Sequence, residues 1–209
     1  MTKAIIFATA NNSSVMLSAE NHASAISQFL IKRSSAATRL RLASEADSEF
    51  LLSLRLDPTR NQNISSTSSD LAEQCSWMRS YEERYAHGKE AYFVIEVDGV
   101  PHGSLRLYDY LPEYNSFCWG SWIIRPGSPP STAFHSAILV YDLAFGSLGF
   151  ARSHFNVRQS NNSVWKFHEK MGARLAREDT SNRFYNYEVK DYRQARERLQ
   201  KFTQRTDFR

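Results

Sequence analysis

The chain has 209 residues, of which 42% are apolar and 13% aromatic. This length suits one domain with a short extension, and a domain of this size folds without disulfides or structural metal. Its two cysteines, Cys75 and Cys118, form no CxxC pair, and its six histidines form no HExxH motif. We therefore predict no metal site and no disulfide framework. The composition excludes collagen-like and wholly disordered chains.

The net charge of +4 lies in the C-terminal tail. Residues 190–209 carry seven basic and three acidic side chains, which leaves residues 1–189 neutral overall. Because nucleic-acid binding needs a broad basic surface, we expect no nucleic-acid partner. The sequence has no run of 18 apolar residues, and its apolar start after Lys3 is short for a signal peptide. We therefore expect no membrane partner and a cytoplasmic location.

The chain begins with an extension, residues 1–37, that is rich in Ser, Ala and Asn. We expect it to be partly disordered, with a short helix at residues 25–30. Alternating apolar residues then predict a strand at 39–42, and helical spacing predicts a helix at 46–55. A polar stretch, residues 57–69, separates this helix from another that starts after Asp70, its expected N-cap, and ends near Tyr85.

Three strands follow, at residues 91–97, 102–108 and 116–124. Asp98 and Gly99 predict a hairpin turn between the first two, which Val100 and Pro101 are expected to lengthen. Strands joined this closely pair antiparallel. The rest of the chain predicts a helix at 131–145, a strand at 153–157, a helix at 162–171, two strands at 173–178 and 184–189, and a basic helix at 191–209.

The loop before the helix at 131–145 has the composition of a phosphate-binding turn. Backbone N–H groups at a helix N-terminus, together with a nearby cation, bind phosphate well. Pro129 and Pro130 have no N–H to offer. The groups that remain are Arg125 and the amides of Ser128, Ser131, Thr132 and Ala133. The alternative is that Pro130 only opens the helix and the loop binds nothing.

Residues 161–173, NNSVWKFHEKMGA, resemble the segment N-x-x-S-x-x-x-Y-E-K-x-G-F of the GNAT superfamily of acyl-CoA N-acyltransferases. The asparagine, the Glu-Lys pair and the glycine coincide, whereas Val164, His168 and Ala173 replace the serine, the tyrosine and the phenylalanine. The similarity extends over residues 38–189. In the pyrophosphate loop the chain departs from the family pattern, because Pro130 and Thr132 stand where two glycines are usual.

The resemblance implies a single α/β (α+β) domain over residues 38–190, with a mixed, mostly antiparallel twisted sheet and helices on both faces. It also implies that the fourth and fifth strands splay apart and that the pantetheine arm of acetyl-CoA lies between them, hydrogen-bonded to the fourth strand. Asn161 would then contact CoA, and as an N-cap it would also contribute about 1 kcal/mol to the helix. The segment 191–209 adds a helix whose apolar seam, Tyr192 to Phe202, covers its own domain or a second subunit in a homodimer.

Three catalytic roles follow from the same resemblance. His168 stands where family members often use a tyrosine to protonate the CoA thiolate, and an imidazolium of pKa about 6.5 is a stronger acid than a phenol near 10. Alternatively, His168 only packs beside Phe167. Backbone N–H groups near Ile123 and Ile124 are candidates for stabilising the oxyanion. The candidate bases are Asp109 and Glu113, either of which can equally be part of a surface loop.

The residues expected at the acceptor site have aromatic faces and short polar groups, which suit a sugar. These residues are Arg60, Asn61, Asn63, Ser65, Ser66, Tyr108, Asp109, Tyr110 and Tyr114, of which Arg60, Asn61, Tyr108 and Tyr110 are the main candidates for binding the acceptor. Arg60 can hold a diphosphate. The segment around Arg60 and Asn61, together with Tyr92-Phe93-Val94-Ile95, resembles GNAT members that acetylate nucleotide-linked amino sugars for bacterial surface polysaccharides. The predicted function is therefore direct acetyl transfer from acetyl-CoA to an amino-sugar nucleotide or another small amine, without an acyl-enzyme. The alternatives are acetylation of a protein N-terminus, as in ribosomal-protein acetyltransferases, and a non-catalytic acyl-CoA-binding module.

Overall fold

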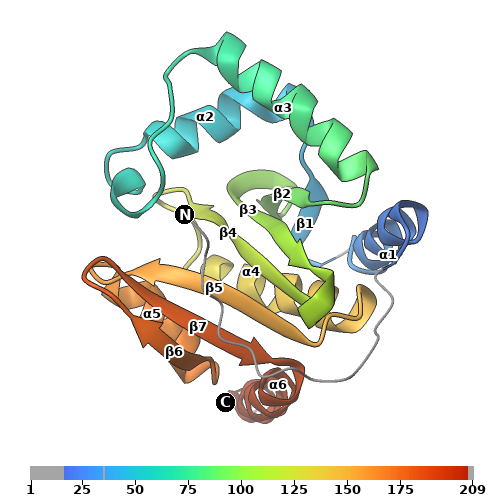
Figure 1. Cartoon of the computed structure of the whole chain (residues 1–209), viewed down its shortest axis with the longest axis vertical. Coiled ribbons are helices and arrows are strands. Elements are labelled where there is room, and N and C mark those ends of the chain that lie inside the picture. The colour runs from blue at the N-terminus through green and yellow to red at the C-terminus, as the bar shows by residue number, and fades with distance from the viewer. Residues whose placement is uncertain (1–16, 35, 207–209) are drawn as a thin grey trace.

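A computed structural model describes residues 17–34 and 36–206, with side chains up to residue 199. Within these residues the chain forms a seven-stranded sheet in the order β1-β2-β3-β4-β5-β7-β6 (Figure 1). The strands are β1 (Thr38–Leu42), β2 (Ala91–Val97), β3 (Val100–Leu111), β4 (Ser116–Ile124), β5 (Arg152–Arg158), β6 (Arg174–Glu178) and β7 (Asn182–Glu188). The helices are α1 (Ala19–Lys32), α2 (Ser48–Leu56), α3 (Leu71–Ala86), α4 (Thr132–Tyr141), α5 (Asn162–Lys170) and α6 (Val189–Thr206).

Helices cover both faces of the sheet, as β2 shows most clearly. All seven of its residues are buried. Tyr92 and Val94 pack in a cluster with Leu51 of α2 and Met78 of α3. Alternate residues, among them Phe93, belong to the larger cluster that contains α4. Successive side chains of a strand point to opposite faces, so a strand that is buried throughout lies between two layers of helices, as predicted.

The connection from β2 to β3 is shorter than the sequence indicates. Asp98 and Gly99 have φ values of 50° and 81°, as in the two-residue turns that match the twist of a hairpin. Val100 and Pro101 do not lengthen the loop, because both already pair with the end of β2 across a bulge that follows Ile95. The prediction of a longer loop was therefore wrong, since the bulge absorbs the residues that the turn does not need.

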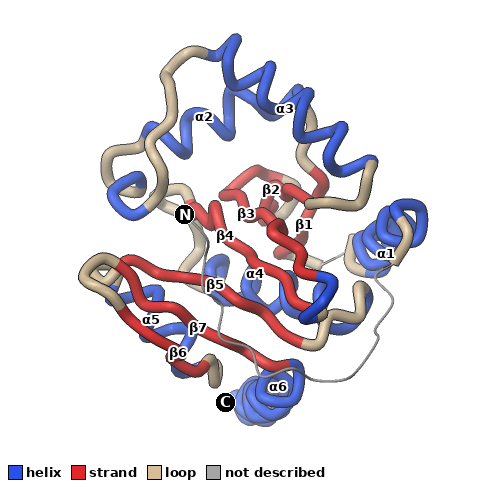
Figure 2. Tube along the Cα trace, in the orientation of Figure 1, coloured by secondary structure: helices blue, strands red, loops and turns tan. Residues whose placement is uncertain are grey.

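The strands β4 and β5 are parallel neighbours that pair over two residues only. Ser116 lies opposite Arg152 and Phe117 opposite Ser153, and no further pairing of these two strands is present among the described residues. Figure 2 shows the strands side by side at this end and diverging toward their C-terminal ends. The predicted splay is confirmed. All other neighbouring strands in the sheet are antiparallel.

The helices at the two ends of the chain are part of the core. Ile26 and Phe29 of α1 are buried in the main cluster, so the helix expected at residues 25–30 is longer and packs on the domain. In α6, Tyr192 and Ala195 are buried against the same cluster, whereas the side chain of Phe202 and the apolar start of the chain lie outside the described residues. No helix within 17–34 and 36–206 is long and apolar enough to cross a bilayer.

Candidate active site

A cleft of about 400 Å³ lies where β4 and β5 separate. Residues 119–122 of β4 and residues 155–158 of β5 form its two walls. Val164 and His168 of α5 contribute from one side of the sheet, and residues 63–65 of the loop between α2 and α3 contribute from the other. The same loop is tied to β5, because Arg158 donates hydrogen bonds to the carbonyls of Gln62 and Ile64.

A bulge in β4 determines which backbone groups reach this cleft. Arg106 of β3 pairs with Gly120 and Ser104 with Ile123, so two residues of β4 oppose one of β3. Ser121, within the bulge, has a φ of 49°. Ile123 and Ile124 pair with β3 and are absent from the cleft lining, which residues 119–122 provide. Gly120 inside a strand was the one sequence signal for such a bulge; the oxyanion role of the isoleucines remains a prediction.

The N-terminus of α4 has the features of a phosphate site. The amides of Ser128 and Thr132 donate to the carbonyls of Arg125 and Pro129. The amides of Ser131 and Ala133 make no hydrogen bond within the described residues, and no side chain caps the helix. The hydroxyl of Thr132 is buried there without a partner among those residues. Two of the four predicted amides are therefore free to donate to a ligand, and the role of this N-terminus in binding a phosphate of acetyl-CoA remains a prediction.

His168 lies under the cleft and is 4% exposed. Its ring packs against Phe155, with 4.3 Å between centroids, and against Trp119. Its Nδ1 is 3.3 Å from the hydroxyl of Tyr141. Burial lowers the pKa of His168 to about 3, so the ring is neutral at neutral pH. The imidazolium on which the predicted acid role depends is therefore not populated at neutral pH without a ligand, and the acid role of this cleft residue remains a prediction.

The two candidate bases lie in different surroundings. Asp109 has a φ of 54°, and its carboxylate is 3.4 Å from Nε2 of His154. Nδ1 of His154 is in turn 2.7 Å from the hydroxyl of Ser116. Glu113 is exposed in the short helical turn Pro112–Tyr114 that follows β3. Neither carboxylate is part of the cleft lining, and both roles remain predictions.

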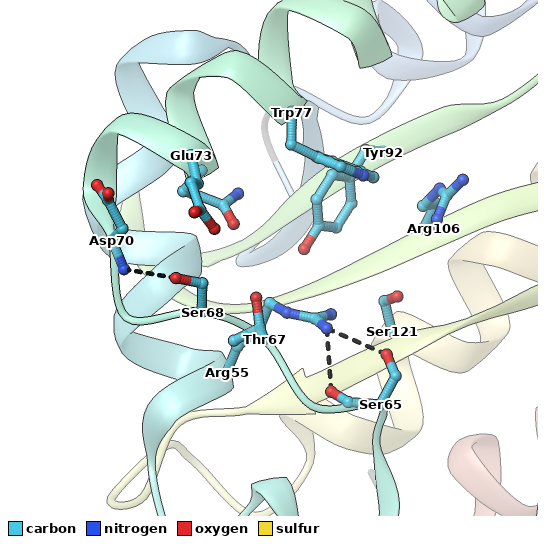
Figure 3. A pocket seen from close by; sticks show the side chains of 11 residues that line it. Arg55, Ser65, Thr67, Ser68, Asp70, Glu73, Trp77, Tyr92, Arg106 and Ser121 are labelled. Atoms are coloured by element: carbon cyan, nitrogen blue, oxygen red, sulfur yellow. Dashed lines mark hydrogen bonds between the residues drawn. The ribbon is translucent and has the colours of Figure 1, made fainter.

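A second cavity, of about 270 Å³, adjoins the cleft between α3 and the sheet (Figure 3). Arg55, Ser65 and Ser121 line both cavities. The contribution of Arg55 and Trp77 could not be predicted, because these residues line one cavity only when α2 packs on α3. The cleft, but not the second cavity, is also lined by Arg158.

The four main candidates for binding the acceptor are not gathered in one place. Tyr108 lines the cleft. Tyr110 instead packs on Phe150, and its hydroxyl lies 3.2 Å from Nε2 of His22 on α1. Arg60 and Asn61 belong to the loop between α2 and α3 but line neither cavity. Asn63 and Ser65 of the same loop, which were also expected at the acceptor site, do line the cleft, and Ser65 lines the second cavity as well.

Comparison with known proteins agrees with this architecture. The family model for the acetyltransferase (GNAT) domain matches residues 38–174. A solved structure of FdhC in its apo form, a nucleotide-linked sugar GNAT, is 40% identical, with a TM-score of 0.73 over 79% of this chain and 94% of that chain. No curated protein sequence matches the chain.

More distant structures share the fold. A mutant of spermidine N-acetyltransferase SpeG from Vibrio cholerae is 17% identical, with a TM-score of 0.62 over 76% of this chain and 97% of that chain. Mycobacterium smegmatis RimJ in complex with CoA-disulfide is 18% identical, with a TM-score of 0.60 over 74% of this chain and 83% of that chain. Since the family model spans more than half of the sequence, the chain belongs to the GNAT family of acetyl-CoA-dependent N-acetyltransferases.

Proposed function

We propose that this enzyme transfers the acetyl group of acetyl-CoA to an amino group of a nucleotide-linked sugar, in the biosynthesis of bacterial surface polysaccharide. The 40% identity to a nucleotide-linked sugar GNAT over most of both chains supports this acceptor class. The more distant polyamine and RimJ structures support the fold alone.

The charge of the cleft is the observation that carries the proposal. Among the described residues its lining contains two guanidinium groups, those of Arg55 and Arg158, and no carboxylate. Both guanidinium groups donate hydrogen bonds to uncharged oxygens of the loop between α2 and α3. A polyamine with several ammonium groups requires carboxylates around it, whereas a diphosphate gains from guanidinium groups. The lining therefore favours an anionic acceptor.

The expected position of acetyl-CoA follows from the splay. From Cys118 onward the edge of β4 that faces β5 pairs with no strand of the described chain, so its backbone groups can hydrogen-bond the pantetheine arm. The phosphates then reach the free amides at the start of α4. The acceptor amine approaches from the side of Arg55, attacks the thioester carbonyl and displaces the thiolate of CoA.

A direct transfer in a ternary complex fits the surroundings of Cys118. Its thiol is buried in β4, with Sγ 3.7 Å from the carbonyl of Trp119. Cys118 does not line the cleft, and an acyl-enzyme would need an accessible thiolate there. The sulfur is therefore in the wrong position to accept the acetyl group.

Release of CoA thiol measured with a panel of acceptors tests the function. We expect release with nucleotide-linked amino sugars and none above background with spermidine or with peptides that have a free N-terminus. Turnover of spermidine or of a peptide alone would overturn the sugar assignment. A rise in melting temperature with acetyl-CoA, combined with no thiol release for any acceptor, would indicate a non-catalytic acyl-CoA-binding module.

A further inference from the structure

The cleft and the second cavity meet at Arg55. Arg55, Ser65 and Ser121 line both spaces, which measure about 400 and about 270 Å³. Figure 3 shows the side chain of Arg55 extending from α2 toward Ser65 and Ser121, with Tyr92 and Trp77 across the cavity from it. A single elongated ligand can therefore occupy both spaces and pass this guanidinium group.

The charge of Arg55 is not paired with a carboxylate in the described structure. Its Nη2 donates to the carbonyl and to the hydroxyl of Ser65, at 3.1 and 3.2 Å. Arg106, which also lines the second cavity, differs because its Nε donates to the buried carboxylate of Glu90 at 2.8 Å. A guanidinium group that is bonded to neutral oxygens keeps its full attraction for an incoming phosphate.

The carboxylate of Asp70 in the second cavity is already engaged. Asp70 accepts a hydrogen bond of 2.7 Å from the amide of Ala72 and so caps α3. In Figure 3 its side chain lies at the outer end of the cavity, away from Arg55. Glu73, the other carboxylate there, makes no ion pair with Arg55. The end of the second cavity that adjoins the cleft is thus the positive end.

The wall of the second cavity provides an aromatic surface. Trp77 is 36% exposed. Its ring makes a parallel contact with Tyr81 and an edge contact with Tyr92, at centroid distances of 6.2 and 5.9 Å. The guanidinium groups of Arg84 and Arg106 lie 5.3 and 5.2 Å from the same ring and leave part of it exposed. Short polar side chains from Thr67, Ser68 and Gln74 complete the lining. A fixed aromatic side chain beside hydroxyl and amide groups suits a nucleoside, which combines a flat base with a polar ribose.

We propose that Arg55 contacts the diphosphate of the acceptor, with the amino sugar in the cleft and the nucleoside in the second cavity against Trp77. This assignment rests on the proposed function and specifies how that acceptor is recognised. The order of the two cavities with Arg55 between them matches the order of the ligand, in which a diphosphate joins a sugar to a nucleoside. Arg55 replaces Arg60 as the predicted diphosphate contact.

Kinetics of the Arg55→Gln enzyme with a nucleotide-linked amino sugar provide the main test. A lost charge-assisted hydrogen bond to phosphate is expected to raise the KM for this acceptor about tenfold or more, with kcat and the KM for acetyl-CoA changed less than about threefold. Trp77→Leu is expected to raise the KM for the acceptor but not for the same amino sugar as its 1-phosphate. The matched control is Arg79→Gln, an exposed arginine of α3 that pairs with Glu45 and lines neither cavity.

Two kinetic outcomes would overturn the assignment. A selective rise in the KM for acetyl-CoA in Arg55→Gln would mean that Arg55 contacts the phosphates of CoA. If Arg60→Gln raises the KM for the acceptor more than Arg55→Gln does, Arg60 rather than Arg55 contacts the diphosphate. Equal melting temperatures for the variants and the wild type exclude loss of the fold as the cause, and Arg55→Lys, which keeps the charge, serves if Arg55→Gln does not fold.

A binding measurement separates this assignment from the proposed function. Uridine, cytidine, guanosine and thymidine diphosphates are titrated into the wild type and Arg55→Gln by calorimetry, without acetyl-CoA. Binding of at least one of them that weakens about tenfold in Arg55→Gln supports the assignment, even if no nucleotide-linked sugar is acetylated. Turnover of such sugars with equal nucleoside diphosphate binding by both proteins, or with no such binding to the wild type, would refute the assignment while leaving the function in place.

Discussion

The hydroxyl of Tyr141 lies 3.3 Å from Nδ1 of His168, and both side chains are buried beneath the cleft between β4 and β5. Burial holds the pKa of His168 at about 3 and raises that of Tyr141 well above its usual value. Both rings are therefore neutral over the range in which the enzyme is assayed. The pair stabilises the floor of the cleft, and its protonation becomes important only when the protein is acidified.

Acidification should destabilise the protein through His168. The unfolded chain takes up a proton on this side chain near pH 6.5, whereas the folded protein does so only near pH 3. The free energy of unfolding therefore falls as the pH drops below 6.5, by up to about 1.4 kcal/mol per pH unit from this group. We expect urea denaturation to show a loss on the order of 2 kcal/mol between pH 6.5 and 5 from this source.

The His168→Gln variant isolates this contribution, because glutamine can still accept the hydrogen bond of Tyr141 but does not titrate. We expect its unfolding free energy to fall less between pH 6.5 and 5 than that of the wild type. His22, whose pKa burial lowers to about 4, keeps its own effect in both proteins. His87→Gln, at an exposed position, should behave like the wild type. Identical slopes for all three proteins would contradict the assignment to His168.

Replacing Thr132 by valine should separate stability from cofactor binding. The Thr132 hydroxyl is buried without a partner in the described structure, and such a group costs about 1–3 kcal/mol. We expect Thr132→Val to raise the unfolding free energy of the free enzyme while weakening acetyl-CoA about tenfold. Calorimetric titration and denaturation measure the two effects, and Thr132→Ser should keep the affinity. Unchanged affinity in the valine variant would mean that the hydroxyl faces away from the ligand.

Asn161 should affect binding more than stability. It occupies the N-cap position of α5, but its side chain makes no capping bond and only accepts from the hydroxyl of Ser163 at 3.4 Å. The sequence-based expectation that Asn161 stabilises the helix by about 1 kcal/mol as a cap is therefore too large. We predict that Asn161→Ala lowers the unfolding free energy by less than about 0.5 kcal/mol. The affinity for acetyl-CoA should fall about twofold to tenfold, as for one lost neutral hydrogen bond.

A comparison helix provides the control for this prediction. Asp70 caps α3 with a bond of 2.7 Å to the amide of Ala72, so Asp70→Ala should cost about 1 kcal/mol or more in the same denaturation assay. If Asn161→Ala is as destabilising as Asp70→Ala, the asparagine contributes to the helix in a way that its hydrogen bonds do not explain.

The parts of the fold that the sequence predicts well are those determined by residues close together in the sequence. The bounds of β2 and β4 agree with the predicted ranges, because each is an apolar run between turn-forming residues. The Asp70 cap is present for the same reason. Tyr108 and Tyr110 show the limit of this reasoning. Two positions apart in a regular strand, they should share a face, but the register shifts between them and Asp109 adopts a φ of 54°.

In the candidate site, too, the features with a local sequence signal could be predicted and those formed by distant residues could not. The motif at residues 161–173 predicts the cleft and the helix that borders it, because the family segment that it resembles occupies a known position in the GNAT fold. The second cavity could not be predicted, because Arg55 and Trp77 come from separate helices and no spacing relates them. The bulge at Ser121, which depends on how β3 and β4 pair, also shifts the cleft lining away from Ile123 and Ile124.

The structure also separates the two candidate bases, and this leads to the last prediction. Asp109 directly follows Tyr108, which lines the cleft, and its carboxylate lies 3.4 Å from His154. Glu113 is exposed beyond the end of β3, at the end of the sheet where β4 and β5 are still paired. Of the two carboxylates, Asp109 is therefore nearer to the residues that line the cleft, and we expect it rather than Glu113 to accept the proton of the amine through a water molecule.

Asp109→Asn is a suitable test because asparagine tolerates a positive φ and keeps the shape of the side chain. If Asp109 is the general base, this change should lower kcat about 100-fold and leave the KM for acetyl-CoA nearly unchanged. Glu113→Gln should stay within about twofold of the wild type, since losing an exposed charge has little effect. Wild-type activity of both variants would show that neither carboxylate accepts the proton.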